Sequence, residues 1–157
     1  MKIKTDKDFL RKECEPIKKN EVGFLVQKMY LEIRKRQNYS YGIALNQLGI
    51  LKRGFVTNKK GVFKYYINPK VLEFNGIEFE NKNEGCLSLE KRYNIKRFDK
   101  ITVIDERNGK QILKGNEAVI FQHELDHING ILILDKKETK WKLWIFLDCL
   151  RCQMLIF

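Results

Sequence analysis

The chain has 157 residues, enough for one domain of ordinary size and too few for two, so we expect a single domain over residues 1–157. Hydrophobic residues make up 43% of the chain and charged residues 32%, with 2 prolines and 10 glycines, which argues against a disordered, collagen-like or low-complexity protein. Lysine and arginine outnumber aspartate and glutamate by 31 to 20, and the net charge of +11 favours anionic partners such as ribosomal RNA.

The cysteines and the N-terminal residues bear on where in the cell the protein is located. Four unevenly spread cysteines do not resemble the disulfide framework of a small secreted protein. The first sixteen residues hold no apolar stretch of signal-peptide length, and their four acidic residues are atypical of a transit peptide. We therefore expect a reducing, cytoplasmic location.

The pattern of apolar residues predicts helix, then strands, then helix. Residues 21–37 carry apolar side chains at helical spacing, with basic residues in the last turn. From about 50 to 113, short β-rich runs alternate with turn signals, and Asn108-Gly109 predicts a hairpin. Residues 116–130 return to helix, with Asn116 as N-cap and Asn129-Gly130 as the stop. This order predicts an α+β domain in which the central helix packs against an antiparallel sheet.

The C-terminal residues are the most apolar part of the chain. Residues 141–157 are interrupted by Lys142, Asp148 and Arg151, and they fall short of the roughly 20 apolar residues that a spanning helix requires. We expect an apolar helix at about 137–157. Its apolar side chains would be buried in the fold, at a membrane surface or in a partner, including a second copy in a homo-oligomer.

Both histidines of the chain lie in one pentapeptide, His123-Glu124-Leu125-Asp126-His127, inside the predicted central helix. At positions i and i+4 the two imidazoles share a helix face and can bind one metal ion. Glu124 then lies beside that ion, where it can transfer a proton. The H-E-x-x-H spacing therefore predicts a metal-dependent hydrolase.

The third protein ligand decides the class of enzyme. A metzincin-type protease would have a histidine at position 133, where this chain has Ile133. A thermolysin-type protease uses a downstream glutamate, for which Glu138 is the candidate. Cys86, in the sequence NEGCLSL, is the stronger candidate, because a thiolate is a soft anionic ligand suited to Fe²⁺, Zn²⁺ or Co²⁺.

Three segments, SYGIALNQLG at 40–49, EGCLSL at 84–89 and QHELDH at 122–127, together resemble the motifs of the peptide deformylase family in the same order. The family motifs read GxGLAAxQ, EGCLS and QHExDH. The second and third match at every defining position. The resemblance implies antiparallel sheets packed around a central metal-binding helix, and it extends over most of the chain up to about residue 135.

The resemblance also implies the reaction, which is removal of the formyl group from N-formylmethionyl peptides of nascent proteins, with release of formate. Cys86, His123 and His127 would hold Fe²⁺, replaceable by Zn²⁺, Ni²⁺ or Co²⁺, with a water as fourth ligand. That water would attack the formyl carbon while Glu124 acts as general base and then general acid. The side-chain amide of Gln47 and the backbone N–H of Leu87 would stabilise the charge on the formyl oxygen.

Four further residues are candidates for binding the substrate. By resemblance, the backbone of Gly42 pairs with the peptide, and Arg92 takes the place of a substrate-contacting arginine although the proline that usually follows EGCLS is missing. Val119 and Ile120 lie one turn before His123, and we expect them to line the pocket for the methionine side chain. The first motif departs from the family pattern at Ser40, Ile43 and Leu45.

Two other functions remain open from the sequence. One is a metalloprotease of the H-E-x-x-H type, which would not need Cys86. The other is a basic RNA- or ribosome-binding module that has kept the scaffold and lost the activity.

Overall fold

The computed structural model describes residues 1–137. Its helices are α1 (Lys7–Leu10), α2 (Val22–Arg34) and α3 (Asn116–Ile128), with short 3-10 turns η1 (Lys19–Glu21), η2 (Leu45–Leu48) and η3 (Asp135–Lys137). The strands are β1 (Gly42–Ala44), β2 (Gly54–Lys59), β3 (Val62–Ile67), β4 (Lys70–Phe74), β5 (Glu78–Cys86), β6 (Leu89–Phe98), β7 (Lys100–Asp105) and β8 (Gly109–Lys114). The helix expected at about 137–157, with Cys149 and Cys152, lies outside the described residues.

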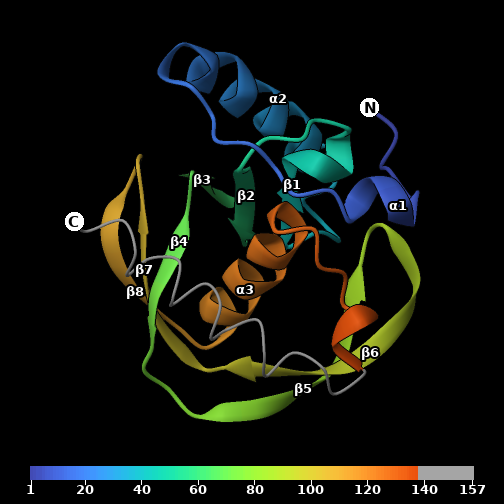
Figure 1. Ribbon diagram of the computed structural model, residues 1–157, viewed down its shortest axis with the longest axis vertical. Helices are drawn as coiled ribbons and strands as arrows, with labels where there is room; N and C mark the ends of the chain where they lie inside the picture. The colour runs from blue at the N-terminus through green and yellow to red at the C-terminus, as the bar shows by residue number, and fades with distance from the viewer. Residues whose placement is uncertain (138–157) are drawn as a thin grey trace.

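The strands form three antiparallel sheets, in the orders β1-β2-β3, β4-β7-β8 and β5-β6. Helix α3 runs through the middle of the molecule, with the β4-β7-β8 sheet on one side and the long β5-β6 hairpin curving past its other side (Figure 1). Helix α2 covers the β1-β2-β3 sheet at the top of the same view. The predicted α+β class, with antiparallel sheets around a central helix, is confirmed.

Helix α3 has an apolar face directed at the core and a polar face that carries the histidines. The core face consists of Ala118, Phe121, Leu125 and Ile128, at the spacing of three and four residues that a helix requires. The ring centroid of Phe121 lies 5.1 Å from that of Phe55 on β2 in an edge-to-face arrangement. This packing fixes the rotation of the helix about its axis, and so it fixes where the opposite face points.

A second core cluster positions the η2 turn. Leu25, Met29 and Ile33 of α2 pack against Ile43 of β1 and against the buried residues of β2 and η2. The backbone N–H of Lys4 also donates to the carbonyl of Gln47, at 2.8 Å. The turn that carries Gln47 is therefore held from two sides.

The sequence prediction of the elements was correct in most places and wrong in a few. The hairpin at Asn108-Gly109 joins β7 to β8, with Gly109 at φ +68°. Asn116 is the first residue of α3 rather than its N-cap, which is Gly115 at φ +55°. Cys86 is the last residue of strand β5 and lies just before strand β6. Strand β1 was not predicted, because its three residues are too few to show an alternating pattern.

Among the described helices, none is both long enough and apolar enough to cross a membrane.

Candidate active site

Helix α3 brings His123, Glu124 and His127 to its polar face. All three side chains are buried or nearly so, and Glu124 is 3% exposed. The two imidazole centroids lie 5.1 Å apart at an interplanar angle of 72°. The i, i+4 spacing therefore gives two neighbouring rings that can share one ligand.

Cys86 completes a group that could hold a metal ion. It lies at the end of β5, and its Sγ is 3.1 Å from Nε2 of His127. The candidate ligand atoms of Cys86, His123 and His127 all lie within 4.8 Å of one another. In a tetrahedral zinc site, bond lengths of about 2.3 Å to sulfur and 2.1 Å to nitrogen separate these atoms by about 3.6 Å. The donor set and its spacing thus fit a divalent ion such as Zn²⁺ or Fe²⁺.

The charge state of Cys86 and the partner of His123 also suit a bound cation. Burial raises the pKa of the Cys86 thiol, but the two neighbouring histidines outweigh burial and lower the pKa to about 5. The thiolate is the form that binds metals. Nδ1 of His123 lies 2.7 Å from Oε1 of Glu84, and a proton on Nδ1 leaves the lone pair of Nε2 for an ion. Nδ1 of His127 has no hydrogen-bond partner among residues 1–137.

Glu124 lies beside this group without being part of it. Its Oε2 is buried and has no hydrogen-bond partner among the described residues. Burial raises the pKa of Glu124 to about 7, although the two histidines oppose the shift. A carboxyl group with this pKa can both accept and release a proton near neutral pH.

Gln47 directs an amide N–H₂ at the site. Its Oε1 accepts a hydrogen bond from the backbone N–H of Ala44 at 3.0 Å, which fixes the orientation of the amide. Nε2 consequently points the other way, 3.1 Å from Oγ of Ser88 and 3.6 Å from Sγ of Cys86. Leu87 lies between Cys86 and Ser88, so its backbone belongs to the same turn.

The four candidate substrate-binding residues lie on β1, β6 and α3. Gly42 on β1 lies against the carboxylate of Glu124. Arg92 on β6 lies over Gly85, the residue before Cys86, and its Nη1 donates to the carbonyl of Asn83 at 3.2 Å. Val119 and Ile120 are half-buried on α3, one turn before His123.

The departures from the family's first motif have local structural explanations. The hydroxyl of Ser40 is buried and donates to the carbonyl of Gly42 at 2.8 Å. The larger side chain of Leu45 is fully buried, and it fills space left by Gly54, where a Cβ would lie 3.1 Å from Cδ1 of Leu45. Both substitutions are therefore accommodated without displacing Gln47.

Of the two alternative third ligands, only the metzincin-type position lies within the described residues. Ile133 is 3% exposed and offers no donor atom. Glu138 lies outside the described residues. The three-membered group found among residues 1–137 uses Cys86.

The sequence analysis did not single out the charged side chains that support the histidines. Glu84 contacts His123, and Arg97 binds both Glu84 and Asp126. Glu84 and Asp126 both belong to the matched motifs, so their positions were visible in the sequence. Arg97 was not, because the sequence contains many basic residues and only the fold shows that this one is 1% exposed.

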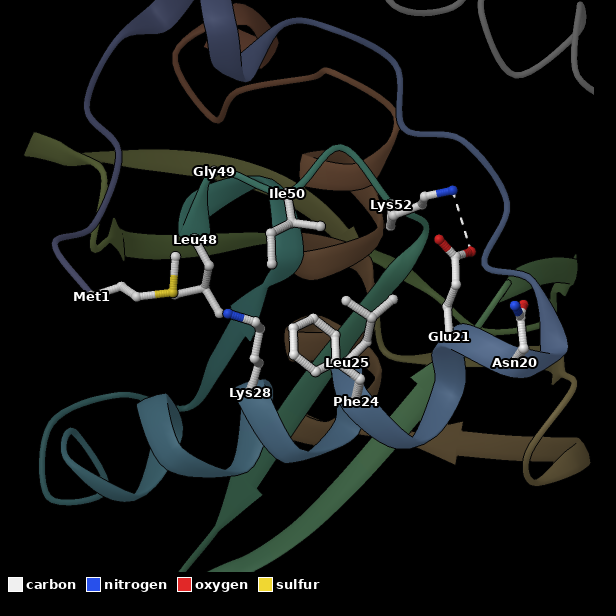
Figure 2. A pocket seen from close by; sticks show the side chains of 10 residues that line it. All are labelled: Met1, Asn20, Glu21, Phe24, Leu25, Lys28, Leu48, Gly49, Ile50 and Lys52. Carbon is white, nitrogen blue, oxygen red and sulfur yellow. Dashed lines mark ion pairs between the residues drawn. The ribbon is translucent and has the colours of Figure 1, made fainter.

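A separate hollow of about 540 Å³ lies between α2 and the η2 turn (Figure 2). Phe24 and Lys28 of α2 face Leu48 and Ile50 across it. It contains none of the candidate site residues, although its wall includes the residue that follows Gln47.

Comparisons with known proteins agree with this geometry. The family model for polypeptide deformylase matches residues 2–142. The chain belongs to the peptide deformylase family. It is 34% identical to peptide deformylase 1 of Clostridium perfringens over 139 residues, which cover 83% of this chain and 92% of that protein. It is 36% identical to the peptide deformylase of Thermotoga maritima over 135 residues, which cover 81% and 80%.

Solved structures of deformylases have the same fold. The crystal structure of the Thermotoga maritima enzyme superposes with a TM-score of 0.75 at 32% identity, covering 85% of this chain and 95% of that one. A class I type b deformylase from Acinetobacter baumannii, bound to Met-Ala-Ser, gives a TM-score of 0.76 at 28% identity, with 85% and 96% covered. The deformylases are metal-dependent enzymes that act on nascent peptides, and the Cys86, His123 and His127 group is compatible with that requirement.

Proposed function

We propose that this deformylase removes the formyl group from N-formylmethionyl peptides and releases formate, with one divalent ion held by Cys86, His123 and His127. The observation that carries the proposal is the convergence of these three ligands, from β5 and α3, beside the buried carboxylate of Glu124. We favour Fe²⁺ as the ion in the cell, because the likeness to the deformylases implies it. A mixed thiolate and imidazole set also accepts Zn²⁺, Ni²⁺ and Co²⁺. When bound, the ion lowers the pKa of water and polarises the formyl oxygen.

Glu124 transfers the proton in this reaction. Its carboxylate accepts a proton from the attacking water as the C–O bond forms at the formyl carbon. The same proton then passes to the leaving amine when the C–N bond breaks, so the products are formate and a free N-terminal methionine. The unpartnered Oε2 of Glu124 and its pKa of about 7 support both steps.

Gln47 and Leu87 stabilise the transition state. Negative charge develops on the formyl oxygen during the attack, and donors fixed in advance lower its free energy. The Nε2 group of Gln47 is held in place through the bond that Oε1 accepts from Ala44. We assign the second donor to the backbone N–H of Leu87, next to Cys86.

The peptide binds alongside β1 and β6. The backbone of Gly42 would pair with the peptide as an added strand, and the guanidinium of Arg92 would contact its carbonyl groups. Val119 and Ile120 would receive the methionine side chain. The Acinetobacter baumannii structure, which contains Met-Ala-Ser, supports the choice of a methionyl tripeptide as substrate.

The test is formate release from formyl-Met-Ala-Ser by the full chain, prepared anaerobically with Fe²⁺, alongside Glu124→Ala. We expect activity in the parent, and in the variant a loss of about 10²-fold or more with metal content unchanged. Glu117→Ala is the matched control, because Glu117 lies on the same helix in an exposed ion pair with Lys59. A folded, metal-loaded parent that releases no formate would refute the proposal.

A further inference from the structure

A buried ion-pair network connects η3, the last turn of the described chain, to His123. Nζ of Lys136 lies 2.6 Å from Oδ2 of Asp126, and Nη1 of Arg97 lies 2.5 Å from the same oxygen. The guanidinium of Arg97 also makes two bonds to Glu84, with Nη2 at 2.6 Å from Oε1 and Nε at 3.1 Å from Oε2. Oε1 of Glu84 is the atom that lies 2.7 Å from Nδ1 of His123.

The burial of this network makes its charge balance important. The side chain of Arg97 is 1% exposed, that of Glu84 is 7%, that of Lys136 is 8% and that of Asp126 is 12%. Within residues 1–137, the two cations and two carboxylates of these four side chains give a formal charge of zero. Without Lys136 the network would carry an uncompensated negative charge where little water screens it.

Glu84 and Asp126 both bind the guanidinium of Arg97, so a change in the contacts of Asp126 affects those of Glu84. Lys136 neutralises Oδ2 of Asp126, the same oxygen that Arg97 contacts. With Lys136 present, the guanidinium can keep its two-bond contact with Glu84. With Lys136 removed, Asp126 would draw the guanidinium away from Glu84, because the carboxylate would have lost its second cation.

We propose that Lys136 is a positioning residue for the metal centre, acting through Asp126, Arg97 and Glu84 to fix the ring of His123. Lys136 touches neither the candidate ligands nor the substrate in this role. The proposal rests on the proposed function, since it assigns His123 to the metal.

The expected effect follows from the role of the partner of a metal-binding histidine. A carboxylate on Nδ1 sets the tautomer and the orientation of the ring, and loss of such a partner costs about 10- to 100-fold in metal affinity or activity. Lys136 is four contacts away from His123, so we expect the lower end of this range, about 10-fold.

The experiment compares Lys136→Met and Lys136→Arg with a control that loosens the same turn. Nη2 of Arg11 lies 2.7 Å from Oδ1 of Asp135, and this ion pair holds η3 without contacting Asp126. Arg11→Met therefore removes an anchor of η3 and leaves the buried network intact. All variants of the full chain are loaded with Co²⁺, and three quantities are measured at pH 7: the visible absorption of Co²⁺, the rate of Co²⁺ release to a chelator, and kcat and KM for formyl-Met-Ala-Ser.

Lys136→Met should release Co²⁺ about 10-fold faster, shift the visible bands and lower kcat with little change in KM. Lys136→Arg should restore all three to near the parent values, and Arg11→Met should leave them unchanged. Equal effects of Lys136→Met and Arg11→Met, or an unrescued Lys136→Arg, would overturn the proposal. So would a Lys136→Met protein that loses thermal stability alone. A parent that binds Co²⁺ but releases no formate would refute the proposed function, while the spectra and release rates would still decide the role of Lys136.

Discussion

The α-carbon of Gly42 lies directly against the carboxyl group of Glu124. A Cβ at position 42 would lie 2.8 Å from Cδ and 2.9 Å from Cγ of Glu124, closer than real Cβ contacts allow. Any side chain at position 42 would therefore force the carboxyl group of Glu124 to move. Gly42 of the first motif therefore leaves the space that the carboxylate of Glu124 in the third motif occupies.

This contact predicts that Gly42→Ala impairs catalysis by displacing Glu124. The methyl group would force the carboxylate away from its present position, and kcat should fall by about 10²-fold while bound metal is retained, since positioning of a general base contributes on that scale. The measurement is formate release together with metal content.

Gly23→Ala is the control for this experiment. No atom lies within 4 Å of a Cβ at Gly23, which is exposed on α2, so alanine there should leave activity unchanged and stabilise the helix by about 0.5–1 kcal/mol. Full activity of Gly42→Ala would show that Glu124 can act from another position.

The lowered pKa of Glu84 should make the free energy of unfolding depend on pH. Burial raises the pKa of Glu84, but His123 and Arg97 outweigh burial and hold the pKa below its usual range. A carboxylate with a lowered pKa in the folded state stabilises the protein above its unfolded pKa of about 4.3, and this contribution disappears as the pH falls through the folded-state pKa.

Urea unfolding of the metal-free protein and of Glu84→Gln should reveal this contribution. We expect the variant to be less stable by on the order of 3 kcal/mol at pH 6, because Arg97 and His123 lose a buried partner. The difference should narrow steadily below about pH 4, because Glu84 then takes up a proton in the unfolded parent while it stays ionised in the folded parent. A difference that is the same at pH 6 and pH 3 would contradict the assignment.

The central helix and the metal-binding pattern could be predicted from the sequence, because both depend on the spacing of nearby residues. His123 and His127 share a face by virtue of helical geometry alone, and the apolar residues of α3 repeat at the matching period. The β-rich region could also be predicted from the sequence, since its strands are separated by clear turn signals such as Asn108-Gly109.

The contacts between segments that are distant in the sequence could not be predicted. Nothing in the spacing of residues shows that Arg97 lies between Glu84 and Asp126, because that depends on how the β5-β6 hairpin curves past α3. The accommodation of Leu45 by Gly54 depends in the same way on the packing of β2 against η2. Side-chain charge and size are visible in a sequence, whereas their neighbours across the fold are not.

Leu45 and Gly54 should be energetically coupled. A Cβ at Gly54 would lie 2.7 Å from Cδ1 of Ile17 and 3.1 Å from Cδ1 of Leu45, so Gly54→Ala should destabilise the protein by about 1–3 kcal/mol through overpacking. Leu45→Ala alone should cost about 2–5 kcal/mol, because it leaves a cavity in the core. In the double variant the methyl group added at position 54 partly fills the cavity left by the side chain of Leu45.

A double-mutant cycle by urea unfolding measures this coupling. We expect the double variant to be more stable than the sum of the single effects by about 0.5 kcal/mol or more. Strict additivity would mean that Leu45 does not occupy the space that Gly54 provides.

Replacement of Cys86 separates a deformylase centre from that of an H-E-x-x-H protease. Cys86→Ala removes one of three candidate ligands, so the protein should lose its metal at chelator concentrations that the parent withstands, and formate release should fall with it. Cys14→Ala is the matched control. Cys14 is buried, whereas Cys86 is partly exposed. Burial raises the pKa of the Cys14 thiol to about 12, and Cys14 is not among the grouped ligands, so its replacement should leave metal content unchanged. A Cys86→Ala protein that kept its metal and cleaved internal peptide bonds would instead identify a protease whose third ligand lies elsewhere.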